Sequence, residues 1–105
     1  MKVIYKAPGN VPGIRDIPNT LEALQEAVEG YIETVTIATD AVVICNEEGR
    51  LRGMEPNCRF CGVEFVGPIL IAGRDGEEFC DLDQMSAEFL LANWKHHKER
   101  RHTDA

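Results

Sequence analysis

Apolar and polar positions alternate in short runs along most of the chain, and the first of these runs predict strands. An apolar run at residues 3–8 ends at Pro8, which suits a strand followed by a turn. The Pro-Gly pair at residues 12–13 favours a type II turn, and a second strand is expected at residues 13–17. The N-terminal part of the chain therefore predicts two strands joined by a turn.

The middle of the chain predicts further strands. Residues 31–38 alternate imperfectly, which suits a half-buried strand, whereas the continuous apolar run at 41–45 predicts a central strand covered on both faces. Polar residues 46–49 then predict a turn, and residues 50–54 are expected to return as the second strand of a hairpin. Residues 63–73 predict one more strand, interrupted by a bulge or lying at an edge because it contains Gly67 and Pro68. Asp75-Gly76 predicts a tight hairpin turn into the segment that follows.

Two segments have helical periodicity instead. The first helix is expected at about residues 20–30, with Asn19 and Glu22 as a capping box. Its apolar stripe consists of Leu21, Leu24, Val28 and Tyr31. A second helix is expected from Asp83 onward and should pack on the sheet. Its apolar face consists of Ala87, Leu90, Leu91 and Trp94, widened by Met85 and Phe89.

These elements predict an α+β fold. Strand runs outnumber helices and most connections are too short for a parallel crossover, so we expect a mainly antiparallel sheet of about five to six strands. Two helices should pack on one face of this sheet. The chain is expected to form a single domain, with an α+β body at residues 1–91 and a helix end with a basic tail at residues 92–105.

Composition narrows the range of functions. The chain has 105 residues, 44% of them hydrophobic, and a formal net charge of -7. Such acidity argues against nucleic acid as a partner, because nucleic-acid-binding domains present a clustered basic face. Residues 95–102 carry +3, which leaves -10 on the rest of the chain. No secretory signal or membrane-spanning stretch is recognised, so a cytoplasmic protein with reduced cysteines is expected.

Several motifs occur in an order that resembles one protein family. These are the helix-to-strand segment LEALQEAVEGYIE, the strand and turn AVVICNEEGRLRGMEPN, and the hairpin VGPILIAGRDGEEFCDL. Their order is similar to that in the small bacterial proteins of domain-of-unknown-function family DUF3846. Here Glu29 stands where that family has a glycine at the helix end, and Cys58 is inserted before Arg59. The resemblance implies a bacterial, phage or plasmid origin, in Firmicutes, and supplies no catalytic residues.

Cysteine spacing raises the question of a metal site. Cys58 and Cys61 have the spacing of a zinc knuckle, but a structural zinc site needs four ligands and the second close pair is missing. Cys45, Cys80, His96, His97 or His102 would have to complete such a site. The alternative is that Cys45 and Cys80 are small core residues and that the Cys58-Cys61 pair is incidental. We therefore expect no cofactor, with zinc at Cys58 and Cys61 as the alternative.

The sequence offers little support for catalysis. All three histidines fall in the terminal basic tail, far in sequence from any nucleophile in the body of the fold. Cys58 and Cys61 precede a predicted strand, whereas a redox pair of the thioredoxin type precedes a helix. We therefore expect a protein that is not an enzyme, with a zinc-binding or hydrolytic protein as a remote alternative.

Polar residues of the predicted hairpin and the loop after it remain as the best candidate for a recognition site. A rigid sheet would present their donors and acceptors to a partner or a small ligand. The leading hypothesis is an accessory or counter-defence factor that binds a host protein through its acidic surface. The alternative is a pocket for an anionic small molecule such as a nucleotide, bound by Arg50, Arg52 and Arg59, which a homodimer interface would complete. The candidate site residues are Asn46, Glu47, Glu48, Arg50, Arg52, Asn57 and Arg59.

Overall fold

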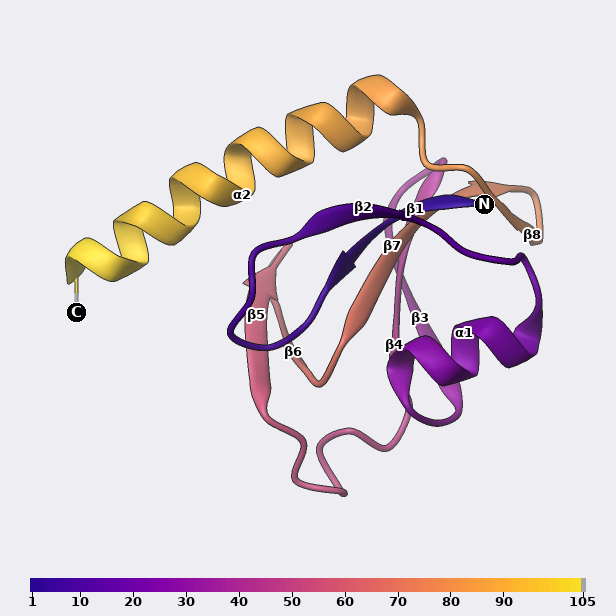
Figure 1. Cartoon of the computed structure of the whole chain (residues 1–105), viewed down its shortest axis with the longest axis horizontal. Coiled ribbons are helices and arrows are strands. Elements are labelled where there is room, and N and C mark those ends of the chain that lie inside the picture. Colours follow the sequence, from indigo (N-terminus) through magenta and orange to yellow (C-terminus); the bar gives the residue numbers. More distant parts are fainter. Residues whose placement is uncertain (105) are drawn as a thin grey trace.

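The structure is a computed structural model that describes residues 1–104, with side chains described for residues 1–94. Residues 1–104 form eight strands and two helices (Figure 1). In chain order these are β1 (Lys2–Lys6), β2 (Gly13–Asp16), α1 (Leu21–Val28), β3 (Ile32–Ala38), β4 (Ala41–Asn46), β5 (Pro56–Phe60), β6 (Val63–Val66), β7 (Ile69–Asp75), β8 (Glu78–Cys80) and α2 (Gln84–Asp104).

Six strands form one antiparallel sheet, as the sequence predicts. Its order is β2-β1-β7-β4-β3, and the short strand β8 pairs with the far end of β7. The central strand β4 is buried along its whole length, which confirms the prediction from its continuous apolar run. The α+β class and the mainly antiparallel sheet are confirmed. Strands β5 and β6 form a separate two-stranded sheet.

The two faces of the large sheet carry different layers, because alternate residues of each strand point to opposite sides. Val42 and Ile44 pack with Leu24 and Val28 of α1 in one core cluster. Val43 belongs to the other cluster, which contains residues of β5, β6 and α2. In Figure 1, α1 lies to the lower right of the large sheet, β5 and β6 lie to its left, and α2 runs from above it to the upper left. The expectation that both helices share one face is therefore wrong.

Helix α1 begins and ends near its predicted limits, but its details differ. Thr20 is the N-cap residue, and its hydroxyl accepts a hydrogen bond from the Ala23 amide at 3.2 Å. Asn19, the predicted cap, instead donates to the Phe79 carbonyl. The predicted stripe is also too wide, because Leu24 and Val28 are buried whereas Leu21 and Tyr31 are more than half exposed.

Helix α2 begins after Asp83, whose carboxylate accepts a hydrogen bond from the Ser86 amide. Ala87 and Trp94 are buried, as predicted. Met85 and Phe89 are 77% and 66% exposed, so they do not widen the buried face. The side chains of the predicted basic tail lie outside the described residues. Neither helix of the described chain has the length and apolar character needed to span a membrane.

Two strand predictions are wrong, each for a different reason. Residues 50–54 form turns and no strand, because β4 already pairs with β3 on one edge and β7 on the other. Residues 63–73 form two strands in different sheets. The break falls at Gly67, which has a φ of 71°, and at Pro68, which has no amide to donate. The β7–β8 hairpin follows its prediction, with Gly76 in its tight turn.

Candidate functional site

A cleft of about 300 Å³ lies where the small sheet packs against the ends of β3 and β4. It is formed by two strands of the large sheet, the start of the loop after β4, and β6. Three of the predicted site residues, Asn46, Glu47 and Arg50, line it. The other lining residues are Glu33, Val35, Cys45, Gly49, Leu51, Val63, Glu64, Phe65 and Val66.

Asn46 and Arg52 fasten the loop after β4 to the end of α1. Asn46 is buried, and its side-chain amide donates to the Val28 carbonyl at 3.0 Å while its Oδ1 accepts from the Glu48 amide. Arg52 Nη1 donates to the Glu29 carbonyl at 2.6 Å. Both contacts use carbonyls that a helix end leaves unpaired. These two predicted site residues therefore have a structural role, because they hold the mouth of the cleft in place.

Close packing at this point depends on Gly30. A Cβ atom on Gly30 would lie 2.6 Å from Asn46 Nδ2 and 3.0 Å from Arg52 Nη1. Real Cβ atoms do not approach another atom as closely as 2.6 Å, so a larger residue at position 30 would displace the Asn46 side chain from the helix end. The glycine that ends the predicted helix is thus part of the support of the loop.

The three arginines proposed for an anionic ligand line three different clefts. Arg50 lines the cleft described above, Arg52 a second one beside Tyr5 and Gly67, and Arg59 a third one beside Trp94. Arg50 Nη2 donates to the Glu64 carbonyl at 2.7 Å, and Arg59 lies 3.6 Å from the Glu64 carboxylate. The structure therefore does not gather the three guanidinium groups around one ligand.

Asn57, the remaining amide of the predicted set, joins β5 to β1 and to the connection between β6 and β7. Its Nδ2 donates to the carbonyls of Lys6 and Gly67 at 2.9 and 2.7 Å. Its Oδ1 is buried and has no hydrogen-bond partner in the described structure. This geometry assigns Asn57 to the attachment of β5 rather than to the cleft.

The cleft around Cys45 carries negative charge on an apolar floor. Its carboxylates are those of Glu33, Glu47 and Glu64, and Arg50 is the cation among its lining residues. Burial, with a further contribution from Glu33, raises the pKa of the Cys45 thiol to about 11, against a smaller opposing effect of Arg50. The thiol at the back of the cleft is thus protonated at neutral pH.

The cysteines proposed as metal ligands do not face each other. Cys58 is buried in the core cluster. Cys61 is exposed in the two-residue turn of the β5–β6 hairpin, where it has a φ of 51° and Gly62 a φ of 77°. Two positive φ values are typical of a type I′ turn. Across the described residues, no group of three or more metal-ligating side chains comes together. His96, His97 and His102 lie outside the described side chains.

Cys45 and Cys80 occupy different positions. Cys45 is buried in the core, as predicted, whereas Cys80 is half-buried at the opposite end of the sheet. Desolvation raises the pKa of Cys80, and the carboxylates of Asp75, Asp81 and Asp40 raise it further. That end of the sheet is therefore also acidic.

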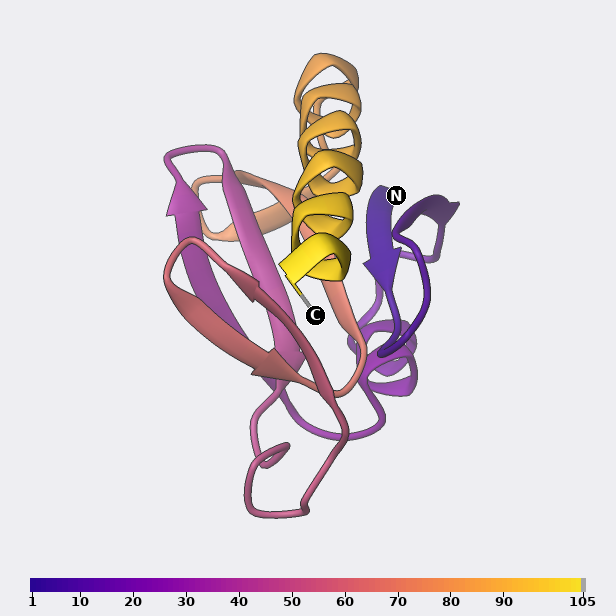
Figure 2. The ribbon, with the colours of Figure 1, turned by 90° about the vertical axis from the view of Figure 1, so that its left-hand side faces the viewer.

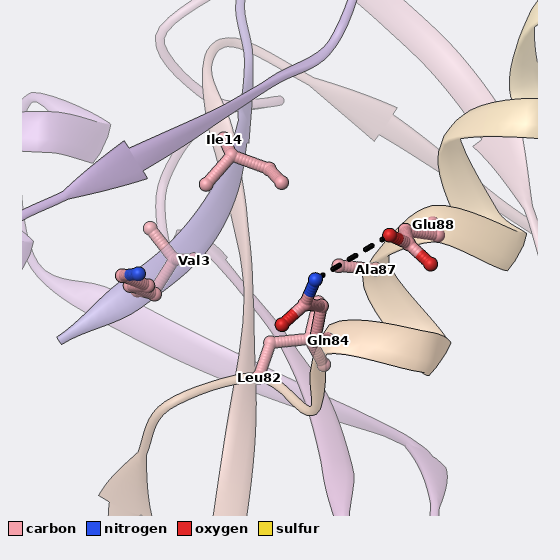
Figure 3. A pocket seen from close by; sticks show the side chains of 7 residues that line it. Val3, Ile14, Leu82, Gln84, Ala87 and Glu88 are labelled. Atoms are coloured by element: carbon pink, nitrogen blue, oxygen red, sulfur yellow. Dashed lines mark hydrogen bonds between the residues drawn. The ribbon is translucent and has the colours of Figure 1, made fainter.

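A smaller concavity of about 210 Å³ lies between the β1–β2 hairpin and the start of α2 (Figure 3). Ile14 and Ala87 face it from opposite sides, and Gln84 and Glu88 form a hydrogen bond of 3.5 Å at its rim. It contains none of the predicted site residues. The cleft at Cys45 is the better candidate because it combines a larger volume with several charged groups.

Residues of β3 and β6 complete this cleft, and none of them is among the predicted site residues. Glu33 and Val35 lie two positions apart and therefore point to the same face of β3, which the alternation of the strand predicts. Glu64 and Phe65 reach the cleft because the small sheet packs on the large one. No local sequence pattern predicts that contact.

Comparisons with known proteins give one match. A family model described as a domain of unknown function, DUF3846, matches residues 1–95. No curated protein and no solved structure matches the chain.

Proposed function

The chain belongs to the DUF3846 family, and on this premise we propose that it is a binding protein without catalytic activity that recognises a host protein through its acidic surface. We place this role in a phage or mobile element, as an accessory or counter-defence factor. The cleft at Cys45 is the proposed point of recognition. Within it, we propose that a lysine or arginine side chain of the partner is bound.

The shape and charge of the cleft carry this proposal. Its apolar side chains, Val35, Val63 and Phe65, offer a surface for the aliphatic stem of a long basic side chain. Its three carboxylates offer acceptors for the charged head group. Arg50 is already hydrogen-bonded to the Glu64 carbonyl and Arg59 pairs with the Glu64 carboxylate, so the carboxylates of Glu33 and Glu47 are the ones left available to a partner.

We also propose that the protein has no catalytic activity, because the thiol in the cleft is a poor nucleophile. The thiol of Cys45 lines the cleft together with the carboxylates, and its raised pKa of about 11 leaves little thiolate at neutral pH. A thiol that stays protonated at neutral pH is a weak nucleophile and suits recognition better than covalent chemistry.

A comparison of two charge-matched triple variants tests the surface. Glu33→Gln, Glu47→Gln and Glu64→Gln together should abolish retention of the host protein by the immobilised chain at low salt. Glu22→Gln, Glu26→Gln and Glu77→Gln remove the same charge from exposed positions outside the cleft and should leave retention unchanged. Equal loss of retention in both variants, or in neither, would overturn the proposed role of the cleft.

A defined small probe tests the cleft itself. Nα-acetyl-arginine methylamide should shift the backbone NMR signals of Gly49 and Val66 in a saturable way, because both residues line the cleft. The matched control is Nα-acetyl-citrulline methylamide, which has nearly the same shape but no positive charge and should produce no saturable shift. Equal shifts with the two probes would contradict recognition of a basic group.

A further inference from the structure

Strand β3 is an edge of the large sheet, and its pairing with β4 shows which of its backbone amides and carbonyls point away from the sheet. It pairs with β4 alone, with Ile32 opposite Asn46 and Val35 opposite Val43. The Glu47 amide donates to the Tyr31 carbonyl, so the backbone groups of Tyr31 point toward the chain of β4. Backbone direction alternates along an antiparallel strand. The amides and carbonyls of Ile32, Thr34 and Thr36 therefore point outward, away from β4.

The part of this edge from Ile32 to Thr36 lacks most of the features that usually prevent edge-to-edge pairing, and the register shift of β3 lies beyond it, between Thr36 and Ala38. Between Ile32 and Thr36 it has no proline, no lysine and no register shift, and Glu33 is its only charged residue. The opposite edge, β2, has four residues, contains Arg15 and Asp16, and lies between Pro12 and Pro18. Figure 2 shows the two edges on opposite sides of the molecule. Natural sheets protect their exposed edges in the way that β2 does.

We propose that β3 pairs with β3 of a second copy of this chain, in antiparallel orientation about a twofold axis through Thr34. This register places Thr34 opposite its own copy and Ile32 opposite Thr36, and all of these residues point outward. Each such pair exchanges two backbone bonds, so the contact forms about six. Glu33 comes opposite Val35, so no two carboxylates face each other directly across the contact.

The twofold axis of this contact has a consequence for the cleft. In a continuous antiparallel sheet the axis is perpendicular to the sheet, so equivalent faces of the two copies lie on the same side. Glu33 and Val35 line the cleft and belong to the paired segment. The two clefts therefore lie on one face, close to the axis. A partner with two basic side chains would bind both at once and gain from the higher effective concentration.

Substitution of Thr34 by proline tests the pairing. The Thr34 amide points away from β4, so Thr34→Pro removes an outward donor and leaves the β3–β4 bonds in place. The wild-type chain should sediment with twice the mass of the 11.7 kDa monomer, and Thr34→Pro as a monomer. Thr34→Val keeps the amide and the branched shape and should remain dimeric. A monomeric wild-type chain at millimolar concentration would overturn the proposal, whether or not the cleft binds a basic group.

Amide hydrogen exchange gives a second test that needs no variant. In the dimer, the outward amides of Thr34 and Thr36 should exchange at least tenfold more slowly than in dilute solution, where the monomer dominates. The inward amides of Glu33 and Val35 are bonded to β4 in both states and serve as the internal control. Exchange at Thr34 that does not depend on protein concentration would contradict the β3 contact.

Discussion

At the scale of single residues, Glu29 stands out because it ends α1 in the left-handed conformation, with a φ of 65°. Its amide bonds to the Glu26 carbonyl and that of Gly30 to the Gln25 carbonyl, which is the Schellman arrangement. Glycine usually occupies this position because a Cβ atom is strained there. The family resemblance also indicates a glycine here, so the strain is a feature of this chain.

Glu29→Gly should therefore stabilise the protein, by about 0.5–1 kcal/mol, because relief of the strain exceeds the added entropy of the unfolded chain. The free energy of unfolding from urea titration measures the effect. Glu26→Gly, inside the same helix, is the control and should destabilise by about 1 kcal/mol. A loss of stability in Glu29→Gly as well would show that its side chain contributes more than the strain costs.

Cys45 makes stability depend on pH in the alkaline range. In the unfolded chain the thiol has an ordinary pKa of about 9.0, whereas in the folded chain its pKa is about 11. Above pH 9 ionisation therefore favours the unfolded chain, and the free energy of unfolding should fall as pH rises from 9 to 11. In Cys45→Ala this fall should be smaller by about 2 kcal/mol. Urea titrations of both proteins at pH 8 and pH 10.5 measure the difference, and parallel profiles would contradict it.

At the scale of elements, the attachment of α2 depends on an aromatic contact with the small sheet. The rings of Phe60 and Trp94 stack with their centroids 5.0 Å apart and their planes at 23°. Trp94 is buried although it lies eleven residues into the helix. This contact connects β5 to α2 over one face of the large sheet.

A double-mutant cycle of Phe60→Leu and Trp94→Leu should give a coupling energy of about 1 kcal/mol, as for other stacked aromatic pairs. The control cycle combines Trp94→Leu with Phe79→Leu. Phe79 packs in the cluster on the opposite face, so the coupling should be near zero. Equal coupling in both cycles would mean that the stacking is not the source of the energy.

At the scale of the whole molecule, the charge is poorly neutralised. The chain has 18 acidic and 11 basic residues. In the described part of the chain, the ion pairs are those of Asp16 with the N-terminus and of Glu64 with Arg59. Acidic side chains surround the cleft at Cys45 and also the far end of the sheet at Cys80. Mutual repulsion of these carboxylates opposes the compact state.

Added salt should therefore raise the melting temperature, since it screens repulsion over distances of about 10 Å at 0.1 M. We expect an increase of several degrees between 10 and 500 mM sodium chloride, measured by calorimetry. The triple variant Glu22→Gln, Glu26→Gln and Glu77→Gln should melt higher at low salt and respond less. A melting temperature that falls with salt would show that attractive pairs dominate instead.

Much of the fold could be predicted from the sequence, because periodicity and turn residues act locally. The alternation at 31–38, the apolar run at 41–45 and the helical spacing of Leu24 and Val28 each identify an element without knowledge of its neighbours. Predictions of which strands pair with each other were less successful. Residues 50–54 were assigned to a hairpin with β4, whose two edges are in fact occupied by β3 and β7.

The candidate site could be predicted only in part. Asn46, Glu47 and Arg50 are indeed at the cleft, since a polar turn after a buried strand must emerge at the edge of the core. Asn46, Arg52 and Asn57, however, use their side chains to join distant backbone carbonyls. The two carbonyls that Asn57 contacts, for example, lie 10 and 51 positions away from it in the sequence. No local pattern reveals such pairs.

The sequence by itself thus determined most of the strands, both helices, the acidity of the chain and the family, because each depends on residue type and short-range spacing. Only the tertiary structure decided that β5 and β6 leave the large sheet, that the helices cover opposite faces, and that Glu64 meets Glu33 and Glu47 around one cleft. The physical reason is that strand pairing and layer packing are contacts between distant segments. Which of the many compatible pairings forms depends on how the whole chain buries its apolar faces.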